Sequence, residues 1–188
     1  QAGGKRLWVQ SSLELKDLSL GASVCHSGVC LTVEESREIE PGLREHVVWA
    51  SNETLDVTTL SGWEAGQEMN LEPSLRLGDE LGGHFVFGHV DALGSVQDIS
   101  QDGEGWIFRF AMPPVLEQLV AHKGSVGVDG MSLTAIDVRD GAFSVAIIPQ
   151  TYEITTLKDR KVGDAINLEA DMLARYVSRQ LSFLPSKA

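Results

Sequence analysis

The chain contains Gly21-Ala-Ser-Val-Cys-His-Ser-Gly-Val-Cys-Leu-Thr32 and repeats it as Lys123-Gly-Ser-Val-Gly-Val-Asp-Gly-Met-Ser-Leu-Thr134, with five identities in twelve positions. Two further blocks repeat in the same order, since residues 53–60 match residues 150–157 and residues 66–72 match residues 163–169. The three blocks hold thirteen identities in twenty-seven positions, at an offset that falls from 102 to 97. A duplicated domain of roughly 95 residues explains this pattern.

The repeat also indicates where the opening strand of the first copy should lie. In the second copy Gly88 precedes Ser125 by 37 residues, so its counterpart in the first copy falls near position −14. We therefore expect the first copy to lack its opening strand in this sequence.

Each copy consists of short runs rich in Val, Ile and Thr, separated by Gly-containing breaks. This spacing is typical of a small antiparallel sandwich or barrel, so the fold class is all-β. The end of the chain differs, because apolar residues from Met172 to Leu181 recur at helical spacing after Asp171, a favourable N-cap residue. We expect this helix to pack on a partner subunit, since an exposed apolar stripe is unfavourable.

Composition limits the classes of function. The chain has 188 residues, 43% hydrophobic and 22% charged, which is enough to build a core. Its formal net charge of −12 disfavours binding to nucleic acids and anionic membranes. No apolar run approaches the roughly 20 residues of a membrane span, and no signal sequence is recognisable, so we expect a cytoplasmic protein. Cys25 and Cys30, taken as lying on one strand, would face opposite ways and remain free thiols.

The sequence has no zinc spacing, phosphate loop or nucleophile motif. The remaining candidates are Gly82-Gly-His-Phe-Val-Phe-Gly-His-Val-Asp91, with His84 and His89, and the polar residues of the repeated element. By themselves these residues also fit turn glycines and half-buried strand polar groups.

The sequence resembles the riboflavin synthase family of the alpha-chain type along nearly all of its length. The matching segments are residues 21–33, 82–90, 123–134 and 167–176, together with Ile148-Pro149 and Leu173-Ala-Arg-Tyr176. The resemblance implies two tandem homologous six-stranded Greek-key barrels and a C-terminal α-helix that helps to build a homotrimer. The expected divisions are residues 1–78, 79–171 and 172–188.

The resemblance also implies a reaction that needs no cofactor. Two molecules of 6,7-dimethyl-8-ribityllumazine exchange a four-carbon unit and give riboflavin and 5-amino-6-ribitylamino-uracil. The productive pair of ligands forms where the N barrel of one subunit meets the C barrel of its neighbour. Association with a lumazine synthase capsid is left open. The alternative is a non-catalytic protein of the lumazine protein type, which binds a lumazine or a flavin.

The family's residues implicated in catalysis fall on Ser23, Cys30, His89 and Asp171. Each has a structural alternative: Cys30 as a small buried side chain, Asp171 as the helix cap alone, Ser23 as a fold residue because it recurs as Ser125. His89 is of the type that changes charge near neutral pH, which suits a base, although a purely structural role stays open.

The family's ligand contacts fall on two sets of residues. The first set is Cys30, Leu31, Thr32, Trp49, Ala50, Ser51, Asn52, Glu53, Thr54, Gly88, His89 and Val90. The second set is Ser132, Leu133, Thr134, Ile148, Pro149, Gln150, Thr151, Tyr152 and Glu153, with Lys123 reaching a ligand across the interface. The sequence departs from the family at Gln150, where Glu or His is commoner, and by having no opening Met-Phe-Thr-Gly segment.

Overall fold

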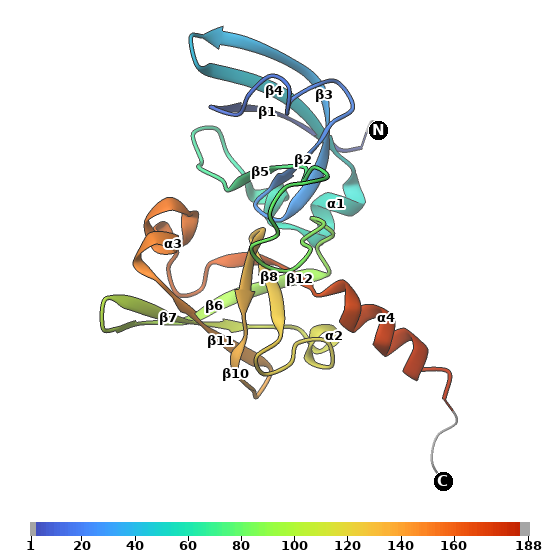
Figure 1. The fold of residues 1–188 in the computed structure, drawn as a ribbon, viewed down its shortest axis with the longest axis vertical. Coiled ribbons are helices and arrows are strands. Elements are labelled where there is room, and N and C mark those ends of the chain that lie inside the picture. Colours follow the sequence, from blue (N-terminus) through green and yellow to red (C-terminus); the bar gives the residue numbers. More distant parts are fainter. Residues whose placement is uncertain (1–2, 185–188) are drawn as a thin grey trace.

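A computed structural model describes residues 3–184 and shows two β units joined in tandem (Figure 1). The first, the N unit, is a five-stranded sheet in the order β1-β4-β3-β2-β5 with antiparallel neighbours. Its strands are β1 (Lys5–Ser11), β2 (Ser23–His26), β3 (Val29–Glu40), β4 (Leu43–Ala50) and β5 (Leu71–Pro73).

The second unit, the C unit, is an antiparallel sheet in the order β10-β11-β7-β6-β12-β8-β9. Its strands are β6 (Ala92–Asp102), β7 (Gly105–Ala111), β8 (Ser125–Val128), β9 (Met131–Thr134), β10 (Ile136–Arg139), β11 (Ala142–Ile147) and β12 (Ala165–Ala170). Only Ala135 separates β9 from β10, so the two ends of the sheet are one bent run of chain and the sheet closes on itself. The all-β prediction is confirmed.

The two units differ at one strand position. In the C unit β6 lies between β7 and β12, whereas the corresponding strands of the N unit, β1 and β5, are the two edges of its sheet. Within residues 3–184 no strand connects these edges. The N unit is therefore open along β1 and β5.

The repeated element forms the same tight hairpin in both units. Ser27-Gly28 joins β2 to β3 and Asp129-Gly130 joins β8 to β9, with positive φ at all four residues. Two consecutive left-handed residues are the geometry of a type I′ turn, which explains the glycines. The hairpin also corrects one expectation: Cys25 and Cys30 lie opposite each other on two strands, not on one, although both are free thiols.

Each unit buries its own apolar core. Strand alternation places the residues Val24, Leu31 and Val33 inside the N unit, and Val126, Phe108 and Phe143 inside the C unit. These side chains are at most 1% exposed except Leu31 at 5%. The period of two in the sequence thus reports which face of each strand is buried.

A reciprocal pair of asparagines joins the two units. Asn70 of the N unit accepts from the Thr156 N–H at 3.0 Å and donates to the Asp129 carbonyl at 3.1 Å. Asn167, its counterpart in the C unit, accepts from the Thr59 N–H at 2.8 Å and donates to the Ser27 carbonyl at 2.7 Å. The units are therefore related by an approximate twofold exchange of equivalent hydrogen bonds.

The turns themselves meet at this junction. A Cβ on Gly28 would lie 2.8 Å from the backbone N of Gly130, and a Cβ on Gly130 would lie 2.8 Å from the backbone N of Gly28. Only glycine permits such an approach at both positions. The same glycines therefore serve the hairpins and the contact between units.

One side of the junction is charged. Asp129 is fully buried and its carboxylate accepts from Arg160 at 2.6 Å and from the Asn167 N–H at 2.8 Å. Burial raises the pKa of this carboxyl, while Arg160 and the Asn167 N–H oppose the rise. The corresponding position in the N unit is Ser27, whose hydroxyl accepts from the Asn70 N–H at 3.1 Å.

The helices are short until the end of the chain. They are α1 (Asn52–Val57), α2 (Pro114–Glu117), α3 (Pro149–Ile154) and α4 (Met172–Leu181), with the 3₁₀ turns η1 (Thr59–Gly62) and η2 (Thr156–Asp159). The predicted C-terminal helix is confirmed, and the Asp171 side chain caps it by accepting from the Leu173 N–H at 2.9 Å. None of its residues is buried, and it extends away from the C unit (Figure 1).

The N unit holds a buried histidine pair. Nε2 of His26 on β2 lies 2.8 Å from Nε2 of His46 on β4, and both side chains are fully buried. Burial, with a contribution from His46, lowers the pKa of His26 to about 4, and burial also lowers the pKa of His46. The C unit has Val128 and Phe143 at the equivalent positions.

The pair makes stability depend on pH. An unfolded histidine has a pKa near 6.5. Below that pH the two histidines are protonated in the unfolded chain but stay neutral in the folded pair, so the unfolded state binds more protons. We expect the free energy of unfolding to be highest above about pH 6.5 and to fall by on the order of 3 kcal/mol towards pH 4 from this pair. Urea denaturation at fixed pH values measures it.

The double variant His26→Val with His46→Phe is the matched control, because it installs the C unit's residues. It should flatten this part of the pH dependence. An unchanged slope in the double variant would show that other groups cause it.

Candidate functional site

Three of the residues predicted to act in the N unit share one face of the β2–β3 hairpin. Ser23 pairs with Thr32 and Cys25 pairs with Cys30, and directly paired residues point to the same side of an antiparallel sheet. This face lies opposite the core, and Thr32 is exposed. Leu31 instead points into the core, so only its backbone is available to a ligand.

A segment from outside the N unit completes this face. Residues 82–91, here called the crossing segment, link the units, and the Cys30 N–H donates to the Gly88 carbonyl at 2.9 Å. Gly88 has a φ of +73°, and a Cβ there would lie 2.6 Å from the Cys30 backbone N. The structure thus brings the predicted runs 30–32 and 88–90 together.

The run from Trp49 to Thr54 borders the same region. It begins at the end of β4, which pairs with β3 through Val33 and Val48. The Ser51 side chain caps α1 by accepting from the Thr54 N–H at 3.2 Å. Trp49 is 45% exposed, whereas Ala50 is buried. The exposed indole and the first turn of α1 therefore follow directly on a strand that is paired with the hairpin.

The remaining two predicted catalytic residues are placed differently. His89 follows Gly88 directly, and its exposed ring stacks on Phe87 with 5.8 Å between ring centroids. Asp171 stands at the start of α4 as its cap. Within residues 3–184 Asp171 makes no hydrogen bond to Ser23, Cys30 or His89.

In the C unit, Ser132 occupies the position of Cys30, and the crossing segment reaches it too. The Ser132 hydroxyl accepts from the His84 N–H at 3.0 Å and lies 2.7 Å from His84 Nδ1. Burial lowers the pKa of His84, against the charges of Asp171 and Glu169. One segment therefore touches the equivalent strands of both units.

The other C-unit candidates lie around α3. Ile148 is the N-cap residue of this helix and Pro149 its first residue, and the Tyr152 ring stacks on Trp106 with centroids 3.8 Å apart. Tyr152 is therefore engaged in packing. Lys123 is exposed at the turn before β8 and has a φ of +60°.

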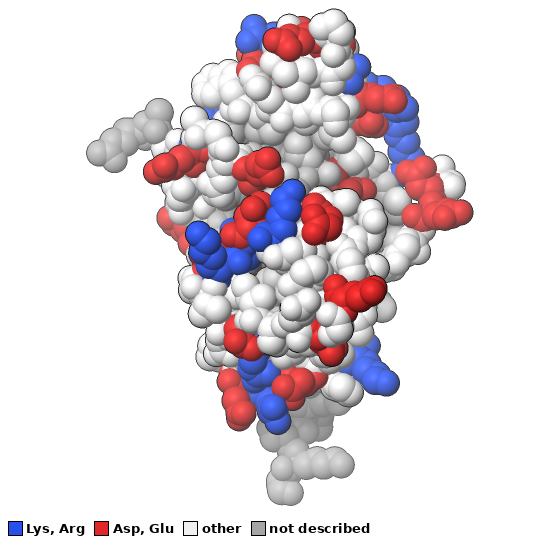
Figure 2. Space-filling model, turned by 90° about the vertical axis from the view of Figure 1, so that its left-hand side faces the viewer, with Lys and Arg blue, Asp and Glu red and all other residues white. Residues whose placement is uncertain are grey.

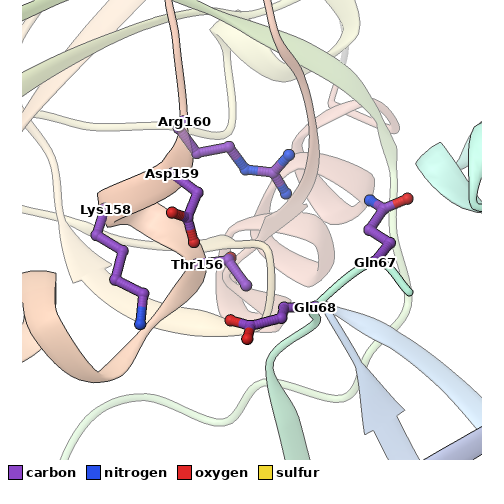
Figure 3. Close-up of a pocket in the computed structure, with 6 residues that line it drawn as sticks. All are labelled: Gln67, Glu68, Thr156, Lys158, Asp159 and Arg160. Carbon is purple, nitrogen blue, oxygen red and sulfur yellow. The ribbon is translucent and has the colours of Figure 1, made fainter.

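A hollow of about 450 Å³ lies elsewhere, between the units. Figure 3 shows its lining side chains, which come from both units and carry both signs of charge: Gln67, Glu68, Thr156, Lys158, Asp159 and Arg160. It shares Thr156 with the asparagine junction and contains none of the predicted site residues. On the face in Figure 2, Lys and Arg lie in small groups among Asp and Glu.

Sequence reasoning missed two side chains at the crossing segment. The buried carboxylate of Glu169 accepts from the backbone N–H groups of residues 87–89, and Arg175 of α4 donates to the His89 carbonyl. Both had a signal, because Glu169 ends the repeated Asn-Leu-Glu and Arg175 lies in Leu173-Ala-Arg-Tyr176. Neither signal says what the side chain contacts.

The described residues include no group of three His, Cys, Asp or Glu side chains placed to hold a metal ion. None of the helices within residues 3–184 is long and apolar enough to cross a membrane.

Comparison with known proteins defines the class. The model of the lumazine binding domain matches residues 2–74 and again residues 87–171, once for each unit. The chain therefore belongs to the lumazine-binding family.

Within this family the chain is similar to riboflavin synthases, which are enzymes of riboflavin synthesis. It is 43% identical to riboflavin synthase of Brucella abortus, over 94% of this chain and 87% of the relative. It is 38% identical to riboflavin synthase of Photobacterium phosphoreum, over 90% of this chain and 76% of the relative. It is 31% identical to riboflavin synthase of Bacillus subtilis, over 93% of this chain and 79% of the relative.

Solved structures show the same fold. LumP complexed with 6,7-dimethyl-8-(1'-D-ribityl) lumazine superimposes with a TM-score of 0.70 at 17% identity, and LumP complexed with riboflavin with 0.71 at 20%. Each comparison covers 88% of both chains.

The contact between Gly88 and Cys30 is testable by adding one methyl group. In Gly88→Ala the new Cβ would meet backbone atoms at a positive φ, so the crossing segment must move. We expect the free energy of unfolding to fall by about 2 kcal/mol, measured by urea denaturation. Gly82→Ala is the control, because no atom lies within 4 Å of its Cβ position. Equal losses in both variants would contradict the assignment.

Proposed function

We propose that the protein is a riboflavin synthase, a transferase that acts on two molecules of 6,7-dimethyl-8-ribityllumazine. The observation that carries this proposal is the similarity to riboflavin synthases over at least 90% of the chain, at 31–43% identity. The juxtaposition of Cys30 with the Gly88-His89 backbone supports it, because it gathers family positions that are far apart in sequence. The similarity to LumP, which is complexed with a lumazine in its crystal structure, supports the assignment of the fold and not the assignment of the activity.

The chemistry moves a four-carbon unit from one lumazine to the other. One ligand loses a proton from its 7-methyl group, the resulting carbanion attacks the second ligand, and the products are riboflavin and the ribitylamino-uracil. Two identical substrates supply every atom of both products, so no external oxidant is consumed. The protein has to hold the two rings together and to transfer protons.

The N unit supplies the groups proposed for this chemistry. Ser23 and Cys30 lie on the outer face of the hairpin, and His89 lies beside it through Gly88. We assign His89 to proton transfer and Cys30 to nucleophilic assistance, with Asp171 joining from the start of α4. Thr32 and the α1 residues offer hydroxyl and amide groups to the ribityl chain and the ring.

The C unit is proposed to hold the second ligand. Its hairpin face carries Ser132 and Thr134, with the first turn of α3 beside them. Ser132 has a hydroxyl where Cys30 has a thiol. The C unit is therefore proposed to bind its lumazine without nucleophilic assistance, so that this ligand either donates the four-carbon unit or does not react. We therefore propose residues 1–78 and 79–171 as two unequal lumazine-binding domains, followed by an oligomerisation segment over residues 172–188.

The exposed face of α4 supports a proposed homotrimer. Leu173, Tyr176, Val177 and Leu181 are 57–68% exposed, although three of them are aliphatic. Covering this stripe with another subunit would remove apolar area from water. In the proposed assembly the N unit of one subunit faces the C unit of its neighbour, in the cytoplasm.

The reaction itself is the first test. We expect the protein, mixed with 6,7-dimethyl-8-ribityllumazine and a metal chelator, to produce riboflavin with an equal amount of the ribitylamino-uracil. Absorbance follows riboflavin, and chromatography measures the uracil. Bound ligand without turnover above the spontaneous rate would favour the lumazine-binding alternative.

Removal of α4 tests the assembly. A chain ending at Asp171 should sediment as a monomer and lose turnover, because the paired ligands are proposed to meet between subunits and because it also lacks Arg175, which binds the His89 carbonyl. A chain ending at Leu181 is the control, because it keeps α4 complete. A trimer that persists without α4, or a monomer that still turns over, would contradict this proposal.

A further inference from the structure

Glu169 binds three consecutive backbone N–H groups of the crossing segment. Its Oε1 accepts from Phe87 at 2.9 Å, and its Oε2 accepts from Gly88 at 2.8 Å and His89 at 3.1 Å. Glu169 is only 3% exposed. A buried carboxylate is unfavourable without partners, and charge-assisted bonds to N–H groups offset that loss of hydration. The partners of this carboxylate all belong to the segment that carries His89.

The same peptide is held from the other side by the N unit. The Gly88 carbonyl accepts from the Cys30 N–H at 2.9 Å, while the Gly88 N–H points to Glu169. The segment therefore lies between a C-unit side chain and an N-unit strand. Moving it would break bonds on both sides.

Arg175 holds the next carbonyl. One of its terminal nitrogens donates to the His89 carbonyl at 2.8 Å and to Asp91 Oδ2 at 2.7 Å. Asp91 Oδ2 also accepts from the Ala170 N–H at 2.7 Å, which ties this group to the end of β12. Both the N–H and the carbonyl of His89 are thus fixed, while its imidazole stays exposed.

We propose that Glu169 and Arg175 are positioning residues that clamp the His89 backbone at the N-unit site. Arg175 lies on α4, so the clamp also makes the position of His89 depend on how α4 is docked. The catalytic part of this inference rests on the proposed function, since it takes His89 to be the group that transfers protons. The clamp itself is a property of the hydrogen bonds.

The N unit offers a matched control. Glu72 on β5 is the repeat counterpart of Glu169, but it is exposed, and its carboxylate accepts no hydrogen bond from residues 3–184. Glu72→Gln removes one carboxylate from the same strand position without touching the crossing segment. It should leave the amide exchange of residues 87–89 at the wild-type rate, because its carboxylate makes no hydrogen bond to the crossing segment.

The experiment compares Glu169→Gln, Arg175→Met and Arg175→Lys with the control. Displacing a reacting group by about 1 Å lowers rates by about 100-fold. We therefore expect kcat to fall about 10- to 100-fold in Glu169→Gln and about tenfold in Arg175→Met, with KM and riboflavin affinity within about threefold. Arg175→Lys should recover part of the loss, because an ammonium reaches one of the two acceptors.

A readout independent of turnover is the amide exchange of residues 87–89 by NMR. These amides should exchange faster in Glu169→Gln than in wild type or Glu72→Gln. Arg175 is partly exposed on a helix without buried residues, so its variants remain informative if Glu169→Gln folds poorly.

Three outcomes would overturn the inference. They are a wild-type kcat in Glu169→Gln and Arg175→Met, unchanged exchange of these amides, or a rate loss matched by equal losses of affinity and stability, as a merely structural role would give. A wild-type protein that makes no riboflavin would refute the proposed function instead. Faster exchange in the variant would still support the clamp in that case.

Discussion

Asn70 and Asn167 each hydrogen-bond to the backbone of the opposite unit, and this exchange fixes how the two units sit against each other. Each amide binds one backbone N–H and one backbone carbonyl of the opposite unit, and Asn167 is buried while Asn70 is half-buried. A buried polar group left unpaired costs about 1–3 kcal/mol, so the exchange strongly favours a single arrangement. The glycine contact between the two I′ turns requires the same arrangement.

The candidate site depends on that arrangement because it is assembled from both units. The hairpin face with Ser23 and Cys30 belongs to the N unit, whereas Glu169 and Arg175, which hold the His89 backbone, belong to the C unit and α4. A rotation of one unit would therefore separate Cys30 from Gly88. The junction thus contributes to function without containing a reacting group.

The two units have diverged where symmetry is not required. The N unit has a buried histidine pair and a thiol, and the C unit has Val128, Phe143 and Ser132 in their places. The junction has a hydroxyl at Ser27 on one side and the Asp129–Arg160 ion pair on the other. These differences suit a reaction in which two identical ligands take unlike roles.

The sequence by itself determined the duplication, the all-β class and the capped C-terminal helix, because these follow from repeated residues, a period of two and local capping. It also placed the candidate positions in two sets, one for each unit. Only the structure decided that a turn places Cys25 opposite Cys30, and that Glu169 and Arg175 hydrogen-bond to the His89 backbone. Local patterns report which face of an element is buried, whereas the bonds of Glu169 and Arg175 to His89 join residues 80 and 86 positions apart, which no local pattern reports.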